Sequence, residues 1–462
     1  MESTFAGLNI ALTSLYAQKR GLDVTGQNIA NANTDGYTRQ RVLMRSLGAP
    51  PVGALYSVDA GSGGGVEVSG VSRMQDDLLI SRARTEHAQD SYLTGVNTTY
   101  GQLEQVFNEP SDTGLQEQLG QFWSDLHDLA NNPGDLATRS TVLQQAQVVA
   151  GDLNSAHTTM ASIWSTTRQT LDSRLIEVNN TADTVAQLNA AIRASYQSGT
   201  PANNLIDQRD QGVLRLSELT GATALSRPDG TVDVYLSGSG LVSGSLSRHL
   251  QATGATRLED QGVTPVAIQW TDNQTSASVT GGEVAADMQS LGQVLPANSA
   301  ALDQVATSLM SQFNTQHQAG YDQNGNPGTA MFTGTGAADI AVAITDPRLI
   351  AASGTASTGG NLDGSNATAL AGLANAANGP DVNYRQMIAN LGVQSQSAAR
   401  RVSIQDSLKQ QVDDALSAQS GVNLDEEMTN MLAYQRAYEA ASRVMTAVDS
   451  TLDTLINHTG LG

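Results

Sequence analysis

The sequence contains no cysteine, which excludes disulfide bonds, thiolate catalysis and cysteine-bound zinc. Aromatic residues make up 4% of the chain and hydrophobic residues 39%, so large apolar side chains that could anchor a compact core are few. The six histidines are scattered and show no metal-binding spacing such as H-x-x-x-H. The sequence therefore predicts no cofactor and no metal site.

Positive charge is also scarce, because 24 Lys and Arg stand against 45 Asp and Glu, for a net charge of −21. This excess of negative charge argues against nucleic acid or an anionic membrane surface as the main partner. No run of about 18 apolar residues is present, so no membrane span is expected. The stretch MESTFAGLNIALTSLYAQKR lacks a basic start followed by a continuous apolar core, and we therefore expect no cleaved secretion signal.

The clearest pattern lies in the last helical stretch, residues 424–457. Apolar residues recur there at every third and then fourth position without a polar interruption, which is the a/d spacing of a coiled coil. A stripe this narrow is buried only against another helix. Its members are Met431, Tyr434, Tyr438, Ala441, Met445, Val448, Leu452 and Leu455.

The other end of the chain offers a partner for this stripe. The same count gives Phe5, Leu8, Leu12, Leu15, Lys19, Leu22, Gly26 and Ile29, of which six are apolar. Residues 1–50 carry five cations and three anions, whereas residues 421–462 carry two cations and six anions, so charge also favours association. We expect the two ends to pair, within one chain or between copies. The alternative is that both are ordinary amphipathic core helices of a globular domain.

The segment that follows the first helix changes direction and then becomes helical again. NANTDG at 31–36 is a turn signal, because Asn31 and Asn33 tolerate the left-handed conformation that ends helices and Asp35-Gly36 favours a turn, so the chain is expected to reverse there. Prolines and a run of glycines predict an extended region near 37–73. Helical spacing then dominates residues 74–196, and its last part is one helix of roughly 55 residues, or about 80 Å, which predicts a rod.

Residues 222–281 show the alternation of apolar and polar positions that is typical of strands, which predicts a small β domain inserted between helices. We expect helix to resume near Glu283, to break at Pro296 and to continue beyond it. Residues 320–379 are rich in Gly, Ala, Thr and Asn and are expected to be dominated by loops. A final helix begins near Asn383 and ends before the terminal stripe.

These patterns together predict a mainly α fold with an inserted β domain, arranged as an elongated, multi-domain rod. The terminal coiled-coil domain comprises residues 1–36 and 422–462. The helical rod domain comprises residues 37–215, 283–320 and 380–421 and includes a hairpin region near 37–73. The outer β domain comprises residues 216–282 with part of 321–379.

Few residues offer site chemistry. The segment 322–328 begins like a calcium loop, but Pro327 replaces the glycine at its sixth position, so a plain turn is expected. The acidic run at 425–427 lies in the first turn of a helix, where negative charge complements the helix dipole. Arg39 and Arg41 are either solvated strand residues or partners in intersubunit salt bridges, and the sequence leaves both possibilities open.

Both ends of the chain resemble a known family. LDVTGQNIANANTDGYTRQ at 22–40 is similar to the N-terminal signature of the bacterial flagellar axial proteins, and VNLDEEMTNMLAYQRAYEAASRVMTAVDSTLDTLIN at 422–457 is similar to their C-terminal signature. SLMSQFNTQHQAGYDQNGNPG at 308–328 also resembles the members found at the hook-filament junction. The residues of the family's signature turn are Asn31, Asn33, Thr34, Gly36 and Tyr37.

The resemblance implies a non-enzymatic structural protein that is secreted unfolded through the flagellar type III apparatus and acts as a mechanical adaptor between hook and filament. The implied partners are further copies of the chain in a ring or helix, the hook protein, the adjacent junction protein and filament, and an export chaperone on the C-terminal helix. The terminal helices would line the inner tube and the β domain would face outward. The apolar stripe residues, apart from Ala441, are then the expected subunit-packing residues.

Two other functions remain open. A hook or distal rod protein would share the terminal signatures but is expected to turn to β structure soon after its first helix, whereas residues 74–197 here read as helical. A secreted enzyme carried on a helical stalk would need a converging acid, base or nucleophile set, and the sequence shows none.

Overall fold

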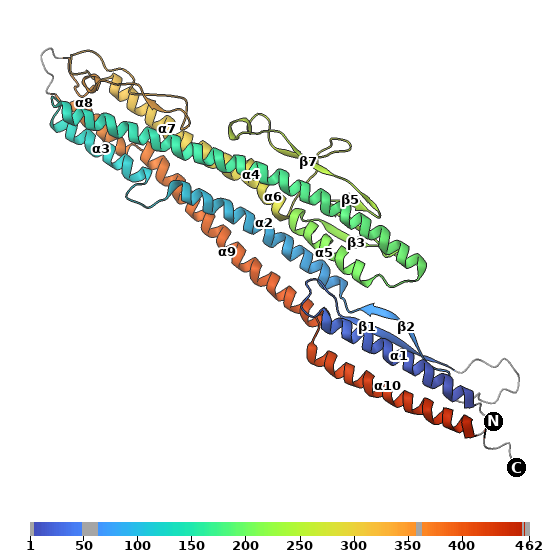
Figure 1. The fold of residues 1–462 in the computed structure, drawn as a ribbon. Coiled ribbons are helices and arrows are strands. Elements are labelled where there is room, and N and C mark those ends of the chain that lie inside the picture. Colours follow the sequence, from blue (N-terminus) through green and yellow to red (C-terminus); the bar gives the residue numbers. More distant parts are fainter. Residues whose placement is uncertain (1–3, 49–62, 357–362, 455–456, 458–462) are drawn as a thin grey trace.

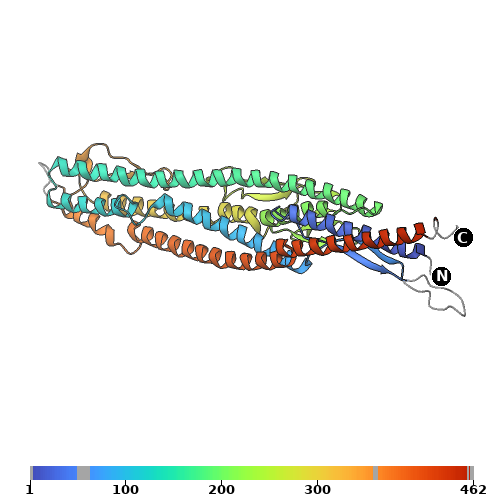
Figure 2. The same ribbon diagram turned by 60° about the horizontal axis from the view of Figure 1, so that its bottom comes forward.

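The computed structural model describes residues 4–48, 63–356, 363–454 and 457, which form an elongated rod of long, roughly aligned helices (Figure 1, Figure 2). The two terminal helices lie together at one end of this rod, and the rest of the chain leaves from that end and returns to it. The predicted mainly helical, elongated architecture is therefore confirmed.

The terminal elements are helix α1 (Thr4–Ala30) and helix α10 (Leu424–Asp453), which lie side by side and antiparallel (Figure 1). This pairing confirms the expectation that the ends of the chain meet. Strands β1 (Gln40–Leu47) and β2 (Gly65–Arg73) form an antiparallel hairpin that packs along α1. The hairpin region predicted near 37–73 thus lies against the terminal helices.

The rod itself is a bundle of helices. They are α2 (Asp77–Phe107), α3 (Leu115–Asn131), α4 (Leu136–Ser198), α5 (Asn203–Thr220), α6 (Gly282–Gln289), α7 (Leu295–Gln318), α8 (Ser365–Ala371) and α9 (Pro380–Ser420). Helix α4 has 63 residues, and at 1.5 Å per residue it is about 95 Å long. It starts where the Asp135 carboxylate accepts the Ala137 N–H at 2.9 Å and ends at Gly199, whose φ of 68° only glycine adopts readily.

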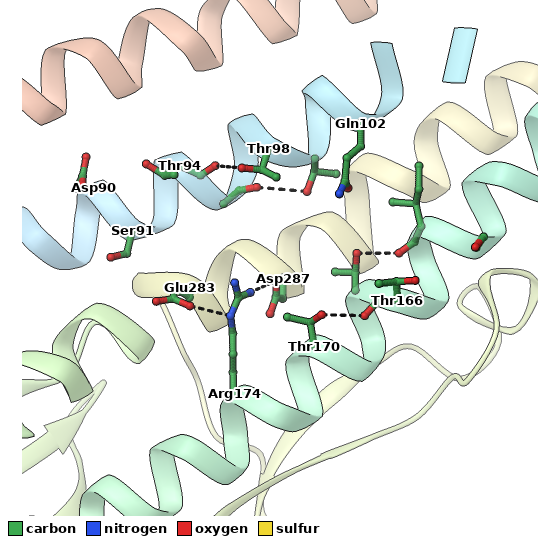
Figure 3. Close-up of a pocket in the computed structure, with 15 residues that line it drawn as sticks. Asp90, Ser91, Thr94, Thr98, Gln102, Thr166, Thr170, Arg174, Glu283 and Asp287 are labelled. Atoms are coloured by element: carbon green, nitrogen blue, oxygen red, sulfur yellow. Dashed lines mark hydrogen bonds and ion pairs between the residues drawn. The ribbon is translucent and has the colours of Figure 1, made fainter. Parts of the chain in front are cut away.

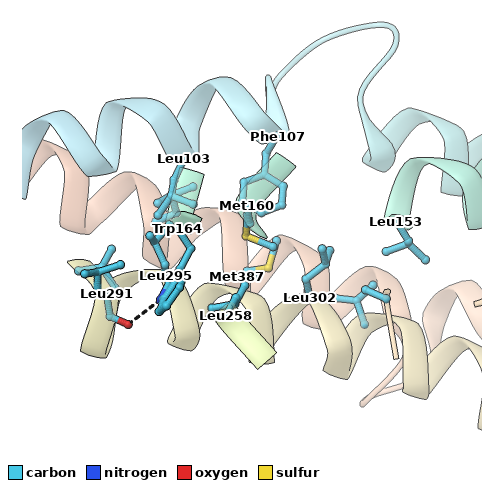
Figure 4. Close-up of a cluster of buried hydrophobic side chains, with 14 of the residues drawn as sticks. Leu103, Phe107, Leu153, Met160, Trp164, Leu258, Leu291, Leu295, Leu302 and Met387 are labelled. Carbon is cyan, nitrogen blue, oxygen red and sulfur yellow. Dashed lines mark hydrogen bonds between the residues drawn. The ribbon is translucent and has the colours of Figure 1, made fainter. Parts of the chain in front are cut away.

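One continuous apolar core runs through the rod and is built on the buried stripe of α4. Trp164 lies fully buried within it, and its Nε1 donates to the Leu291 carbonyl at 3.1 Å (Figure 4). Because an indole N–H left without an acceptor in a dry core is costly, this bond fixes where α4 contacts the segment before α7. The α4 members of the core include Val142, Ala146, Val149, Leu153, Met160, Leu171, Leu175, Val178, Ala182 and Val185.

The expectation that helix breaks at Pro296 is wrong. Residues Ser290–Val294 form one π-helical turn that joins α6 to α7 without a gap in the helical path. Pro296 lies in the first turn of α7, where a missing backbone N–H is tolerated and the fixed φ suits a helix. The π turn places one extra residue before Pro296, so the helical path continues past the proline.

The β region is attached to α4 by asparagine side chains. Strands β3 (Thr223–Ser226), β4 (Val232–Leu236), β5 (Ser239–Ser243) and β6 (Leu246–Ser247) form one antiparallel sheet, and β7 (Leu250–Thr253) pairs with β8 (Ala267–Trp270). The Asn189 amide donates to the carbonyls of Val232 and Gly244 at 2.7 and 2.8 Å. Apolar side chains of the strands join the core of the helices, so the division into a separate outer domain stays a prediction.

The described parts of this region, residues 320–356 and 363–379, contain mostly loops besides the short helix α8, as the sequence predicted. They include strands β9 (Phe332–Thr333) and β10 (Ala341–Val342) and short 3-10 helices at Pro347–Leu349 and Gly372–Asn375; another, at Leu258–Asp260, lies in the β region. The Asp322 carboxylate accepts the backbone N–H groups of Asn324 and Asn326, each at 2.8 Å. Its segment is therefore a turn closed by its own aspartate.

His317 is a buried histidine whose protonation state should affect stability. Its Nδ1 lies 2.6 Å from the Thr329 carbonyl and its Nε2 accepts the Ala351 N–H at 2.9 Å, so the ring is neutral with its proton on Nδ1. Burial lowers the pKa of His317 to about 4. In the unfolded chain the His317 ring takes up a proton near pH 6.5. The stabilisation of the fold by the neutral ring is therefore complete above pH 6.5 and is lost as the pH falls toward 4, which lowers the free energy of unfolding by about 3 kcal/mol in total.

We therefore expect the His317→Gln variant to lose less stability than the parent between pH 7 and pH 4.5 in urea unfolding. The His127→Gln variant is the matched control, because His127 lies exposed on α3 and lacks the burial of His317. An equal loss in parent and His317→Gln would show that this ring does not titrate as described.

Candidate assembly interface

The contact between α1 and α10 is made where α1 has small residues. A Cβ atom built on Gly21 would lie 2.7 Å from the Tyr434 ring, and one on Gly7 would lie 3.8 Å from Val448. The Tyr434 ring therefore rests directly on the α1 backbone. Such close approach strengthens van der Waals contact but leaves no room for a side chain at position 21.

On α10, the stripe read from the sequence faces α1. Ala441 is buried and the other described stripe positions are half-buried, except that Tyr438 is 39% exposed. Residues one position away along the helix are mostly exposed. Leu455 lies outside the described residues. The half-buried members are Met431, Tyr434, Met445, Val448 and Leu452.

On α1, the buried residues do not coincide with the stripe read from the sequence. Ala11, Ala17 and Val24 are buried, whereas Leu12 is 40% exposed. The reason is that α1 packs on two sides at once, against α10 through its small residues and against the hairpin, where Gly65 lies close to Thr13. Leu8, Leu15, Leu22 and Ile29 are half-buried at the flank of the contact, and the side chain of Phe5 lies outside the described residues.

Asn28 joins α1, the start of the β1–β2 hairpin and the first turn of α10, at the end of the helix pair that is nearer the rod. Its Nδ2 donates to the Gln40 carbonyl at 2.9 Å and to Glu427 Oε2 at 3.0 Å. Its Oδ1 accepts the Gln40 N–H at 3.0 Å and the Tyr37 hydroxyl at 2.8 Å. Because Asn28 is buried and all of these bonds are made inside the chain, it fixes the start of the hairpin against α1 and α10.

Arg39 binds the acidic first turn of α10. Its Nε lies 2.7 Å from Glu427 Oε1 and its Nη1 lies 2.7 Å from Glu426 Oε2. Both expectations for Arg39, a solvated residue or an intersubunit salt bridge, are therefore wrong, because its partners lie far along the same chain. Glu427 does more than complement the helix dipole, since it is 2% exposed and shared between Arg39 and Asn28. Arg41 is exposed, and its intersubunit salt bridge stays a prediction.

The signature turn is closed by side chains of its own residues. The Asn31 amide donates to the Gln27 carbonyl at 2.9 Å and Thr34 Oγ1 lies 3.2 Å from Asn31 Oδ1. Within this turn only Gly36 has a positive φ, 72°, so neither Asn31 nor Asn33 adopts the left-handed conformation that asparagine tolerates. Asn31 instead uses its side chain to satisfy the end of α1. Asn33 is exposed.

Tyr37 and Gly36 link the turn to its neighbours. Burial, with Asp207 and Glu427 nearby, raises the pKa of Tyr37 to about 12, which keeps its hydroxyl protonated as a donor to Asn28. Gly36 lies against Gln211 of α5, whose amide donates to the Asp35 carbonyl at 2.5 Å. A Cβ at position 36 would overlap Gln211.

A second ion cluster joins the hairpin to α5. Arg73 Nη2 lies 2.9 Å from Asp210 Oδ2, and Arg73 Nε lies 2.8 Å from Asp207 Oδ1 in an ion pair that lacks hydrogen-bond alignment. Arg84 lies 3.6 Å from Asp210. Burial raises the pKa of Asp207 even though Arg73 opposes the shift. The cluster fixes the terminal helices relative to the rod, and no local sequence pattern announced it.

The sequence did contain a signal for Glu427. Counting one further step of four back from Met431 along the stripe reaches Glu427, so a carboxylate occupies a position at which the pattern calls for an apolar residue. A polar residue at such a position needs a specific partner. Asn28, next to Ile29 of the α1 stripe, is the corresponding polar residue on the other helix.

The cleft between α2 and α4 is the place where an enzyme site would be sought first. It has a volume of about 470 Å³ and is lined mainly by Thr and Ser side chains (Figure 3). Arg174 binds both carboxylates at its floor, Glu283 at 2.8 Å and Asp287. Burial raises the pKa of Asp287 to about 6 against the pull of Arg174. This arrangement is an ion pair that joins α4 to α6.

Among the described residues, no group of three or more His, Asp or Glu side chains is placed to hold a metal ion. In the part of the chain that the structure covers, no helix is both long and apolar enough to cross a membrane.

Three segments match known families. Residues 100–332 match the family described as flagellar hook-associated protein FlgK helical domain. Residues 8–38 match the flagella basal body rod protein family, and residues 416–458 match the family described as flagellar basal body rod FlgEFG protein C-terminal. The two terminal matches cover most of α1 and α10.

Full-length relatives and a solved structure agree with these matches. Flagellar hook-associated protein 1 of Bacillus subtilis is 31% identical over 100% of both chains. The proteins of the same name from Escherichia coli and Salmonella typhimurium are 31% and 30% identical over 70% and 71% of this chain, which spans 59% of their length. The flagellar hook junction protein FlgK of Burkholderia pseudomallei shares the fold, with a TM-score of 0.64 and 18% identity over 72% of this chain and 99% of that one. The chain therefore belongs to the flagellar hook-associated protein 1 family.

Proposed function

We propose that this chain is a structural protein of the bacterial flagellum that assembles between hook and filament and acts there as a mechanical adaptor. Copies of the chain would pack through the terminal helix pair into a ring or helix, with the hook on one side and the adjacent junction protein and filament on the other. The rod of helices would form the next shell and the β region would face outward.

The observation that carries this proposal is the pair of terminal helices at one end of the rod. The pair contacts the rest of the molecule through the hairpin and through the ion clusters of Arg39 and Arg73, at the end nearer the rod. Large side chains such as Leu12, Tyr16, Met428 and Leu432 stay exposed. Most of the stability of a helix in a protein comes from packing against its neighbours, and these helices leave much of their surface unpacked within one chain. Neighbouring copies would supply the missing burial, and the predicted packing residues on both helices are the candidates for that contact.

The proposed route to the flagellum is export of the unfolded chain. An exported chain must be kept unfolded before export, and the apolar stripe of α10 is the segment that a chaperone would cover. The absence of cysteine fits a chain that folds outside the cell without disulfide chemistry. The chaperone is thus expected to protect residues 424–452 and to release them at export.

The experiment that tests this function is electron microscopy of cells that lack the protein. We expect hooks of normal length without attached filaments, and restoration of filaments by the full-length gene. Normal filaments on the deletion strain would contradict the proposal. Unaltered filaments together with loss of an enzymatic activity would instead favour the stalked enzyme, whereas missing hooks would favour a hook or rod protein.

A further inference from the structure

Two apolar stripes remain exposed on the terminal pair, away from the contact between its helices. Leu424, Met428 and Leu432 follow one face of α10 at intervals of four residues and are between 48% and 57% exposed. Leu12 and Tyr16 have the same spacing on α1 and are 40% and 67% exposed. Residues four apart lie one above the other on a helix, so each group is a short continuous stripe.

The antiparallel register places these stripes at different heights. Gly7 lies opposite Val448, Gly21 opposite Tyr434 and Asn28 opposite Glu427, and the two residue numbers add to 455 in each pair. By this rule Met428, the centre of the α10 stripe, lies at the height of α1 residue 27. The α1 stripe is centred at residue 14. The difference of 13 residues is about 20 Å along the axis, so the two stripes cannot meet within one chain.

Four exposed cations lie at about the height of the α1 stripe, whereas two exposed anions lie at the height of the α10 stripe. Lys19, Arg20, Arg436 and Arg443 are exposed, and by the register they lie at heights equivalent to α1 residues 12–20, next to the α1 stripe, with Glu439 as the anion among them. None of these four cations is in an ion pair within the described ranges. Asp425 and Glu426 lie beside the α10 stripe, and Asp449 lies near the other end of the pair.

We propose that the α10 stripe of one copy packs on the α1 stripe of a second copy that is displaced by about 20 Å along the axis. At this displacement Met428 falls between Leu12 and Tyr16 of the second copy, and Asp425 lies within one turn of its Lys19 and Arg20. Arg436 becomes level with Asp449 of the second copy. This inference rests on the proposed function, and it names the partner of the terminal pair as a staggered copy of the same chain.

The charge pattern also disfavours packing without displacement. Two copies at equal height would bring Lys19, Arg20, Arg436 and Arg443 of both chains to the same level, where like charges repel. The staggered contact joins two different surfaces and is therefore heterologous. Because each copy is displaced along the axis, such a contact continues from copy to copy into a helix and does not close on a dimer.

Because the natural chain has no cysteine, introduced cysteines test this contact without background. Full-length Met428→Cys protein is mixed with full-length Leu12→Cys protein, assembled at high concentration and oxidised. The control mixture pairs Met428→Cys with Gln27→Cys, since Gln27 is exposed on α1 at the height of Met428. Disulfides form only between Cα atoms less than about 7 Å apart, so we expect roughly tenfold more mixed product with Leu12→Cys than with Gln27→Cys.

The outcomes separate this inference from the function on which it rests. An assembled sample that links Gln27→Cys as well as or better than Leu12→Cys overturns the displacement. An assembled sample that links neither overturns the contact between the stripes. A chain that stays monomeric at every concentration contradicts the proposed function itself.

A charge exchange gives a second, independent readout. The Asp425→Lys variant should raise the critical concentration for assembly up to about fivefold, because an exposed ion pair contributes at most about 1 kcal/mol. Combining it with Lys19→Glu and Arg20→Glu should restore most of the loss. Additive weakening in the triple variant would overturn the placement of Asp425 against these two cations.

Discussion

Replacing Gly21 by leucine is expected to raise the critical concentration for assembly by roughly tenfold to a hundredfold and to leave cells with hooks that lack filaments. Even the first atom of a side chain at this position would lie 2.7 Å from the Tyr434 ring. Forcing extra carbon atoms into a filled contact costs about 1–3 kcal/mol, and each 1.4 kcal/mol changes an equilibrium about tenfold. The measurement is sedimentation of the purified full-length variant over a range of concentrations.

Gly26 provides the matched control on the same helix. A Cβ at Gly26 meets no atom within 4 Å, so leucine there adds no overlap. Because glycine is a poor helix former, the Gly26→Leu variant should assemble as well as the parent or at up to about fivefold lower concentration. Equal damage from both substitutions would mean that α1 does not approach α10 at Gly21.

Removing the Arg39 side chain is the second change with a large expected effect. Glu427 is 2% exposed in the parent, and the Arg39→Ala variant would remove its cationic partner and leave its negative charge bound to Asn28. Leaving one member of a buried ion pair unpaired costs about 3 kcal/mol, which corresponds to roughly a hundredfold rise in the critical concentration. Adding Glu427→Gln removes the buried charge and should recover part of this loss.

Arg45 on the same hairpin is the control for Arg39. It pairs with Glu67 at 3.1 Å, but both side chains are exposed to solvent. Ion pairs of that kind contribute about 0–1 kcal/mol, so the Arg45→Ala variant should assemble nearly as the parent does. Should Arg39→Ala and Arg45→Ala behave alike, the buried pair would have no part in holding the terminal helices.

The α10 stripe could be predicted from sequence because α10 packs along its length mainly against α1. A helix that touches one neighbour along one line shows that line as a clean repeat from Met431 to Leu452. The α1 contact could not be located to the residue, because α1 packs against both α10 and the hairpin. Counting large apolar side chains selects Leu8, Leu12 and Leu15, but it passes over Gly21, which lies directly against the Tyr434 ring.

The pairing of polar side chains across the fold lay beyond the reach of sequence patterns. Arg39 and Glu427 are separated by 388 residues, and nothing in the neighbourhood of either one identifies the other. Asn189 likewise reads as one more polar residue on a long helix, although it satisfies backbone groups of Val232 and Gly244. Propensity and periodicity thus predicted the helices, the turn at Gly36 and the strand region, while side-chain partners depended on the fold.

The central claim is that the terminal helices become fully ordered only when copies of the chain pack together. The most direct test is hydrogen exchange of the full-length protein, first as a monomer verified by sedimentation and then assembled. We predict rapid exchange of backbone amides in residues 5–29 and 424–452 of the monomer and strong protection after assembly, with the core of α4 protected in both states. Strong protection of residues 5–29 in the verified monomer, unchanged on assembly, would contradict the claim.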